Sequence, residues 1–235
     1  MTVIDMADHL VRHEVTISSA DMGWLATALL AAAADNEIYG PQYHARVWTD
    51  GTSLDAIAMD PYHVHHLHIE LDEEVDTVDV VVPRDALEWA KKNARLFRAK
   101  KDSLIHPVAR FVFLLPMDPD SDLKSWVSIV YQEWDDENAP SARFDAPLYA
   151  EAYPPAARII DAARTAEPSG PVPLSLDHLS DARTIATAFS AVPVIQYTRR
   201  ESGKPGPAIL DFWEGQVLRG TALISPISGG DGGDS

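Results

Sequence analysis

Apolar positions along the chain repeat with two periods, and each period predicts a different element. A spacing of three and four residues predicts a helix over residues 22–34. Alternation of apolar and polar positions predicts strands in the same region, over residues 15–17, 43–49, 54–59 and 63–71. The pair Asp50-Gly51 is typical of a tight hairpin turn between two of these strands.

The same order of elements follows further along the chain. Residues 78–82 are rich in valine and predict a strand, and Pro83 then precedes a helix predicted over residues 84–101. Three strands are predicted next, over residues 111–115, 126–134 and 143–148. Residues 151–173 are rich in Pro, Ala and Gly, and this composition predicts a linker or crossover.

A third copy of the pattern closes the chain. A strand is predicted over residues 172–176 and a helix over residues 177–189, followed by strands over residues 194–198, 209–213 and 217–224. The copies begin near residues 14, 78 and 172 and share the order of elements rather than the sequence. This pattern predicts an α+β fold with helices on one face of antiparallel sheets.

The repeats also predict the domain organisation. Two units are expected to form one domain over residues 1–160, and the third unit a second domain over residues 161–235 that ends in a flexible acidic tail.

Composition narrows the classes of protein that the chain can represent. Of its 235 residues, 46% are hydrophobic and 23% are charged, which is typical of a globular protein. The absence of cysteine excludes disulfides, thiolate metal sites and cysteine nucleophiles. No apolar run approaches the ~20 residues that span a bilayer, and no signal peptide is evident. A cytoplasmic protein without a membrane partner is therefore expected.

Several motifs resemble those of the bacterial DNA polymerase III β sliding clamp, in a divergent and shortened form. The stretches that carry the resemblance are VWTDGTSL at 47–54, VVVPRDAL at 80–87, ARFDAPL at 142–148, EAYP at 151–154, VPLSLDHL at 172–179 and TALISPI at 221–227. This chain departs from the family's sequence pattern in two ways. Ser53 stands where a basic residue is common, and the closing arginine-leucine of the family's last strand is absent.

The cation-rich segment after Pro83 is the main functional candidate. In a chain of formal net charge −17 it concentrates seven cations, namely Arg84, Lys91, Lys92, Arg95, Arg98, Lys100 and Lys101. Long cationic side chains on one helical face suit sequence-independent contacts with DNA phosphates. The alternative is a solvated helix face with pairs such as Glu88–Lys92. The helix of residues 22–34 has no cation and the third helix offers only Arg183, so a clamp pore built from them would be less basic than the family's.

The resemblance also implies a peptide-binding groove for partner proteins. In clamps this groove uses the end of the last strand, which makes Ile224, Pro226 and Ile227 the expected partner-binding residues here.

Four histidines in the segment HVHHLH suggest a different chemistry. On a strand, His66 and His68 share one face, and His63 and His65 share the other. Two imidazoles at this spacing can chelate a divalent metal if a third ligand, such as Asp60 or Glu70, lies near. No sequence motif of a metallohydrolase, a nucleotide-binding loop or a serine hydrolase accompanies them, so no catalytic residue, metal or cofactor is expected.

Together these observations predict a non-enzymatic, clamp-like protein that encircles duplex DNA and tethers a DNA polymerase or another replication or repair protein. Two alternatives stay open: an interaction or inhibitor protein that keeps the clamp fold without encircling DNA, and a metal-dependent enzyme that uses the histidine strand. Since clamp rings contain about twelve such units, three units a chain imply a homo-tetrameric ring and four would imply a trimer.

Overall fold

A computed structural model describes residues 9–99, 106–118, 120–133, 140–187 and 191–227. The first unit of the chain contains β1 (Leu10–Ser18), α1 (Ser19–Ala32), the 3-10 helix η2 (Glu37–Tyr43), β2 (Ala45–Thr49), β3 (Ser53–Met59) and β4 (His63–Glu70). The second contains β5 (Asp79–Val82), α2 (Arg84–Ala94), β6 (Val108–Pro116), β7 (Trp126–Gln132) and β8 (Ser141–Pro147). After α3 (Ala156–Thr165), the third contains β9 (Glu167–Pro168), α4 (Leu176–Thr187), β10 (Val192–Arg199), β11 (Pro205–Glu214) and β12 (Val217–Ile224).

The strands form two antiparallel sheets, and the first two units exchange strands between them. One sheet has the order β1-β6-β7-β8 and the other β5-β2-β3-β4-β12-β11-β10-β9. The first strand of each of these units therefore joins the sheet of the other: β1 pairs with β6, and β5 pairs with β2. The third unit extends the larger sheet because β12 pairs with β4.

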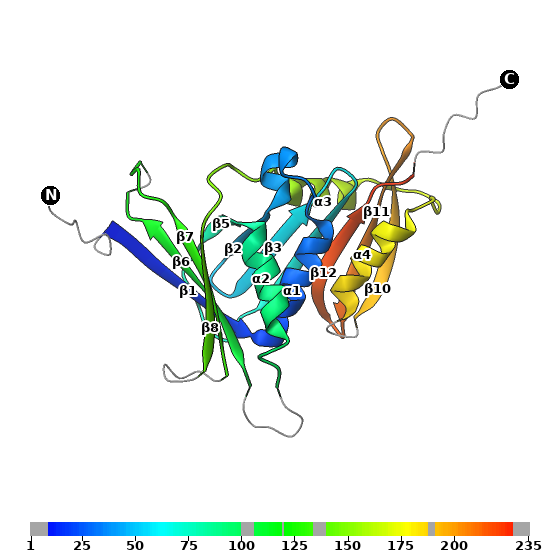
Figure 1. Cartoon of the computed structure of the whole chain (residues 1–235). Helices are drawn as coiled ribbons and strands as arrows, with labels where there is room; N and C mark the ends of the chain where they lie inside the picture. Colours follow the sequence, from blue (N-terminus) through cyan, green and yellow to red (C-terminus); the bar gives the residue numbers. More distant parts are fainter. Residues whose placement is uncertain (1–8, 100–105, 119, 134–139, 188–190, 228–235) are drawn as a thin grey trace.

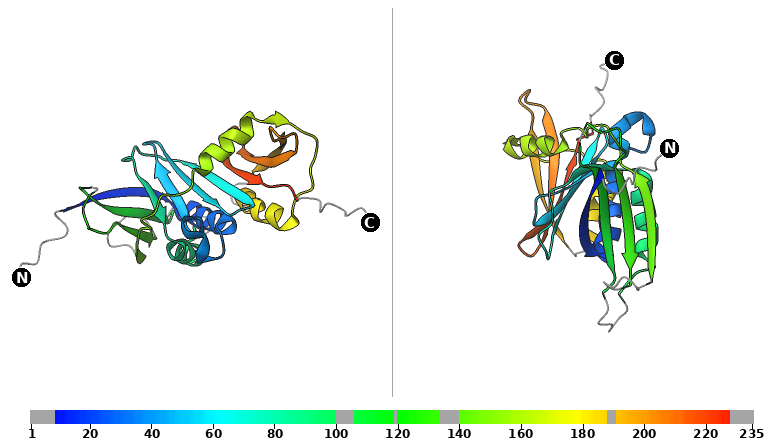
Figure 2. Two further views of the ribbon diagram at one scale, coloured as in Figure 1. Left: turned by 90° about the horizontal axis from the view of Figure 1, so that it is seen from above. Right: turned by 90° about the vertical axis from the view of Figure 1, so that its left-hand side faces the viewer.

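Helices lie on both faces of the larger sheet. Helices α1 and α4 pack on one face of this sheet, whereas α2 packs on β7 and β8 of the smaller sheet. The three helices form one layer, with α1 between α2 and α4. Helix α3 lies on the opposite face, as the view from above shows (Figure 2). Strand β3 is buried along its whole length because α1 covers one of its faces and α3 the other. The predicted α+β fold is confirmed, but its helices are not confined to one face.

Two elements that the sequence did not predict lie between the second and third units. Residues 151–173 were expected to be a linker or crossover, and α3 and β9 lie there. Ala156, Ile160 and Ala163 follow a helical spacing and pack against the outer face of the larger sheet. Residues 160 and 161, between which the two domains were expected to divide, both lie within α3.

The strand predicted over residues 172–176 is also wrong. Pro171 and Pro173 lack the N–H groups that a ladder requires, and the carbonyl of Ser175 accepts a hydrogen bond from the N–H of Leu179 as α4 begins.

Helix α2 ends at Ala94, although it was predicted to continue to residue 101. Beyond Ala94 the chain turns, and the ring of Phe97 stacks on Tyr131 with centroids 5.4 Å apart. The carbonyl of Phe97 also accepts a hydrogen bond from the hydroxyl of Ser19 at the start of α1. Packing of Phe97 onto β7 thus competes successfully with continuation of the helix.

Candidate nucleic-acid interface

The layer of α1, α2 and α4 forms the face on which the predicted DNA contacts lie. Helix α1 carries no Lys or Arg, and apolar residues lie on all its sides. A helix that is apolar all round is one that has little solvent face. The lack of cations on α1 therefore reflects its position between α2 and α4.

The crossing of α1 and α2 is close because α1 has a glycine at the contact. A Cβ atom added to Gly23 would lie 2.6 Å from the Cβ atom of Ala94. These two small residues set how near α2 lies to α1, and so where the cations of α2 stand.

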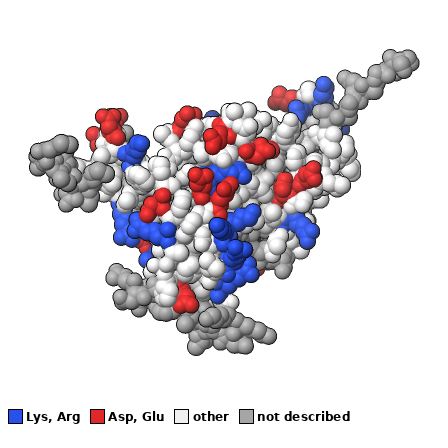
Figure 3. Space-filling model, viewed as in Figure 1, with Lys and Arg blue, Asp and Glu red and all other residues white. Residues whose placement is uncertain are grey.

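Lys91 and Lys92 are exposed in the last turn of α2. Arg95 and Arg98 are also exposed, and they follow the helix end instead of continuing its face. None of these four cations has an ion-pair partner among the described residues. In the space-filling view a group of Lys and Arg side chains gathers over α2 (Figure 3). Lys100 and Lys101, also predicted to contact DNA, lie outside the described residues.

Arg84 differs from the other predicted contacts because its donors are already engaged. Its Nε donates to Glu88 Oε1 at 2.8 Å, and its Nη1 donates to the carbonyl of Ala34 at 2.9 Å. The guanidinium also lies over the ring of Tyr43, 5.0 Å from its centroid. Arg84 therefore joins α2 to the chain that leaves α1, and has less freedom to meet a phosphate than Lys91.

A groove of about 540 Å³ runs over α1 between α2 and α4. Its floor is formed by Thr27, Leu30 and Ala31 of α1. Its walls are formed by Arg84, Glu88, Lys91 and Lys92 of α2 and by Asp181 and Thr184 of α4. Arg183 is exposed on α4, but the acidic Asp181 faces the groove. Cationic character is therefore concentrated on the α2 side.

The residues predicted to bind partner proteins do not form one exposed surface. Ile224 is fully buried in the core at the end of β12. Pro226 is half-buried, and Ile227 is 51% exposed while its N–H donates to the carbonyl of Pro173. In this conformation only the last two could meet a partner.

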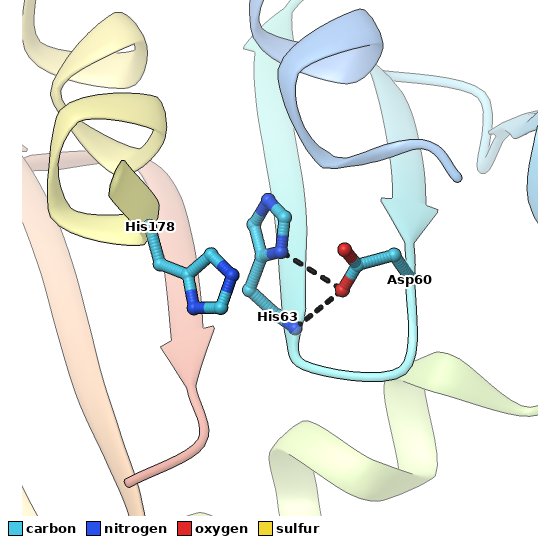
Figure 4. Close-up of side chains that lie close together, drawn as sticks. All are labelled: Asp60, His63 and His178. Atoms are coloured by element: carbon cyan, nitrogen blue, oxygen red, sulfur yellow. Dashed lines mark hydrogen bonds and ion pairs between the residues drawn. The ribbon is translucent and has the colours of Figure 1, made fainter. Parts of the chain in front are cut away.

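The inward-facing histidines form a cluster with residues of α4 (Figure 4). His63 Nδ1 lies 2.9 Å from Asp60 Oδ1, and its Nε2 lies 3.0 Å from the carbonyl oxygen of Ala31. Both partner atoms are acceptors, so both ring nitrogens donate, which only the imidazolium form can do. Burial alone would lower the pKa of His63, but the Asp60 carboxylate raises it above its usual value.

Asp60, His63 and His178 each place one potential metal-ligating atom within 4.8 Å of the others. However, the rings of His63 and His178 stack with their planes 19° apart, which does not aim two nitrogen lone pairs at one ion. Both nitrogens of His63 are also held by oxygen acceptors. The geometry fits a hydrogen-bonded and stacked joint better than a chelate.

The other histidine pair, His66 and His68, lies on the opposite face of β4. His66 Nε2 and His68 Nδ1 lie 3.0 Å and 3.1 Å from Asp55 Oδ1. Burial alone would raise the pKa of Asp55, but hydrogen bonds from His66, His68 and Ser53 lower it below its usual value. Of the two possible third ligands named from the sequence, Asp60 contacts His63 of the other pair.

Sequence reasoning missed Asp55 and His178, which are the partners of these histidines. Asp55 lies on β3 directly opposite His68 in the sheet register, so a correct hairpin register could have identified it. His178 reaches the cluster only through the packing of α4 on the sheet, for which the sequence offers no local signal.

No protein-family model matches the sequence. A comparison with curated proteins also finds no match. Solved structures do resemble it. The DNA polymerase sliding clamp from Pseudomonas aeruginosa has a TM-score of 0.57 at 12% identity, with 92% of this chain and 66% of the clamp covered. The sliding clamp from Bacillus subtilis has a TM-score of 0.54 at 10% identity, with 92% and 64% covered.

The β subunit of DNA polymerase from Streptococcus pyogenes has a TM-score of 0.51 at 12% identity, with 91% and 65% covered. The chain thus spans slightly less than two thirds of the length of these structures. Among the residues that the structure describes, no helix is long and apolar enough to cross a membrane. The chain has the α+β fold of the DNA polymerase III β sliding clamps.

Proposed function

We propose that this protein is a non-enzymatic, cytoplasmic, sliding-clamp-like factor that holds duplex DNA against the layer of α1, α2 and α4. The observation that carries the proposal is the group formed by Lys91, Lys92, Arg95 and Arg98, exposed on this face without ion-pair partners among the described residues. Cations of this kind bind phosphates without reading sequence, which allows a protein to slide along DNA.

The tethering role would depend on two features: a closed ring around the DNA, and weak contacts between its cations and the DNA phosphates. A closed ring built from several copies, four if each chain supplies three units, would stay on DNA while each contact exchanges rapidly. The proposed domains of residues 1–160 and 161–235 would then join within α3, which packs against strands of both the first and the third unit. A DNA polymerase or another replication protein would be the tethered partner, with Pro226 and Ile227 as candidate contacts.

The alternative is a clamp-fold protein that binds a replication protein without encircling DNA. The net charge of −17 and the acidic Asp181 in the groove favour this alternative. An enzyme that uses His66 and His68 as metal ligands has less support, because both contact the buried Asp55.

The proposal is tested with the triple variant K91E/K92E/R95E. Its matched control is R199E/R200E/K204E, which changes the net charge by the same amount at the hairpin between β10 and β11. We expect the α2 variant to lose binding to a duplex at low salt and the hairpin control to keep most of it. Equal binding by the two variants, or no binding by the unmodified protein, would contradict the proposal.

Encirclement is tested separately on circular and linear duplexes of the same sequence. A ring is expected to remain on the circle after a salt challenge that abolishes electrostatic contacts, and to leave the linear duplex through its ends. Retention that is equal on the two DNAs would favour the non-encircling alternative.

A further inference from the structure

The smaller sheet has an outer face on which no described helix packs. Its inner face carries Phe111, Phe113 and Tyr131, which are buried in the core together with residues of α1 and α2. Side chains alternate between the two faces along a strand, so the residues between these three point outward. On the larger sheet the outer face is covered by α3, which packs on β3 and β11. The outer face of the smaller sheet has no such cover among the described elements.

Three arginines from three different strands line a groove on this outer face. Arg12 lies on β1, Arg110 on β6 and Arg143 on β8. The groove has a volume of about 400 Å³. Its other lining residues are Val112, Leu114, Val130 and Ser141, so none of the described residues that line it is acidic. In the space-filling view, Lys and Arg side chains gather over this sheet, apart from the group over α2 (Figure 3).

Carboxylates beside the groove hold the arginines over the sheet. Glu14 Oε1 lies 3.4 Å from Arg110 Nε, and Glu14 also contacts Arg12. Asp145 Oδ1 lies 2.8 Å from Arg143 Nη2. The side chains of Arg12 and Arg143 are still 63% and 59% exposed. Because a guanidinium carries several N–H donors, each of these two side chains can bind a further carboxylate.

Charge and an aliphatic floor favour an acidic peptide segment as the occupant. Three arginines around one groove attract an anionic partner although the chain as a whole has a net charge of −17. Clusters of arginine recognise acidic motifs in proteins. The floor offers Val112, Leu114 and Val130 for aliphatic contacts. The described lining includes no aromatic ring on which a nucleic-acid base could stack.

We propose that this face docks an acidic segment of a partner protein. Its carboxylates bind Arg12 and Arg143, and its aliphatic side chains pack on Val112 and Leu114. Helix α2 packs on the other face of the same sheet, where Tyr131 donates a hydrogen bond to the carbonyl of Ala90. The groove is therefore turned away from the helical layer, and a partner can dock while DNA lies on that layer. Peptide docking needs no DNA, so either proposal can fail without the other.

The test uses a fluorescent synthetic peptide in which Glu and Leu alternate, added to the full-length protein at low salt. Fluorescence anisotropy is expected to show binding. R12Q/R143Q is expected to weaken it by at least about tenfold, because hydrogen bonds between charged groups are lost. K91Q/K92Q removes the same charge from α2 and should leave the peptide affinity unchanged. Duplex binding should show the reverse pattern, and circular dichroism verifies that both variants are folded.

A second peptide, in which Ser replaces Leu, tests the aliphatic floor and should bind more weakly. The proposal is overturned if the unmodified protein does not bind the Glu-Leu peptide, or if the two variants weaken its binding equally. Equal binding of the Ser peptide also overturns it, since attraction between charges alone would then explain the contact. Two results replace the proposed occupant. Loss of duplex binding in R12Q/R143Q would identify DNA, and peptide binding only after removal of residues 1–8 would identify this chain's own amino-terminal segment.

Discussion

His63 on β4 and His178 on α4 stack with their ring centroids 4.7 Å apart and their planes 19° apart. The contact joins the third unit to the first on the helical side of the sheet, where Asp181 Oδ2 also lies 3.8 Å from His63 Nε2. Together with the pairing of β12 and β4, it fixes α4 relative to α1 and α2. The position of Arg183, which is exposed on α4, therefore depends on this joint.

Replacement of His178 tests the contribution of the stacking. His178 Nδ1 is buried with no hydrogen-bond partner among the described residues, so the ring acts here chiefly through packing. His178→Ala is expected to lower the free energy of unfolding by about 0.5–1.5 kcal/mol. His178→Phe should match or exceed the stability of the unmodified protein, because it keeps the ring and removes the unpaired nitrogen. Urea unfolding measures both variants, and equal losses for Ala and Phe would show that stacking is not the cause.

The charge of His63 depends on Asp60. Because the raised pKa belongs to the folded state, the protonated ring stabilises the fold fully below the unfolded pKa of 6.5, and this contribution is lost as the pH rises through the folded pKa. Asp60→Asn keeps an oxygen for the N–H groups of Tyr62 and His63 but removes the carboxylate charge. An NMR titration of the His63 ring is expected to show a lower pKa in this variant. An unchanged pKa would mean that Asp60 does not hold the proton.

His65 has the opposite pH dependence. Its ring is fully buried against α1, where Nδ1 lies 2.7 Å from the carbonyl oxygen of Ala28, and burial lowers its pKa to about 3. Since the unfolded ring binds a proton below pH 6.5, the stability from a neutral His65 is lost as the pH falls below that value.

The expected slope approaches about 1.4 kcal/mol per pH unit between pH 6 and ~5, where most carboxylates are still ionised. His65→Asn should flatten it, because an amide can donate to Ala28 without titrating. His106→Asn changes an exposed histidine and serves as the control. The free energy of unfolding is measured across this pH range for both variants. If it changes equally with pH in His65→Asn and His106→Asn, then His65 does not cause the pH dependence.

A substitution at Gly23 tests the crossing of α1 and α2. Alanine in place of glycine in a helix usually stabilises it by about 1 kcal/mol. At Gly23 the sign should reverse, with a loss of about 1–3 kcal/mol, because the added methyl group would lie against the Cβ atom of Ala94. Gly170→Ala places a methyl group in open space and provides the comparison. Denaturant unfolding that finds Gly23→Ala more stable than the parent would contradict the close crossing.

The repeating order of elements could be predicted from the sequence because each unit follows a local period. Alternation located β3 and β4, and the helical spacing of Leu25 and Leu29 located α1. The predicted elements were wrong where tertiary contacts decide which element forms. Helix α2 stops at Ala94 because Phe97 packs on Tyr131, which no local pattern shows.

Of the candidate sites, the cations of α2 were predictable from the sequence, whereas the partners of the histidines were not. The cations of α2 could be found because charge clusters are visible in a sequence of opposite net charge. The partners of the histidines could not be found in this way, since Asp55 and His178 meet them through sheet register and helix packing. Helix α3 was missed although Ala156, Ile160 and Ala163 have a helical spacing, because the prolines before it favoured a linker.

The salt dependence of duplex binding tests the central claim most directly. The logarithm of the binding constant should fall linearly with the logarithm of salt concentration, and each phosphate contact adds about 0.9 to the slope. If Lys91, Lys92 and Arg95 each contact one phosphate, then K91E/K92E/R95E should reduce the magnitude of the slope by about 2.7 for each chain on the DNA, at ~0.9 for each cation. The hairpin control R199E/R200E/K204E should leave the slope unchanged. An α2 variant with the parent's slope would show that DNA does not lie on the helical face.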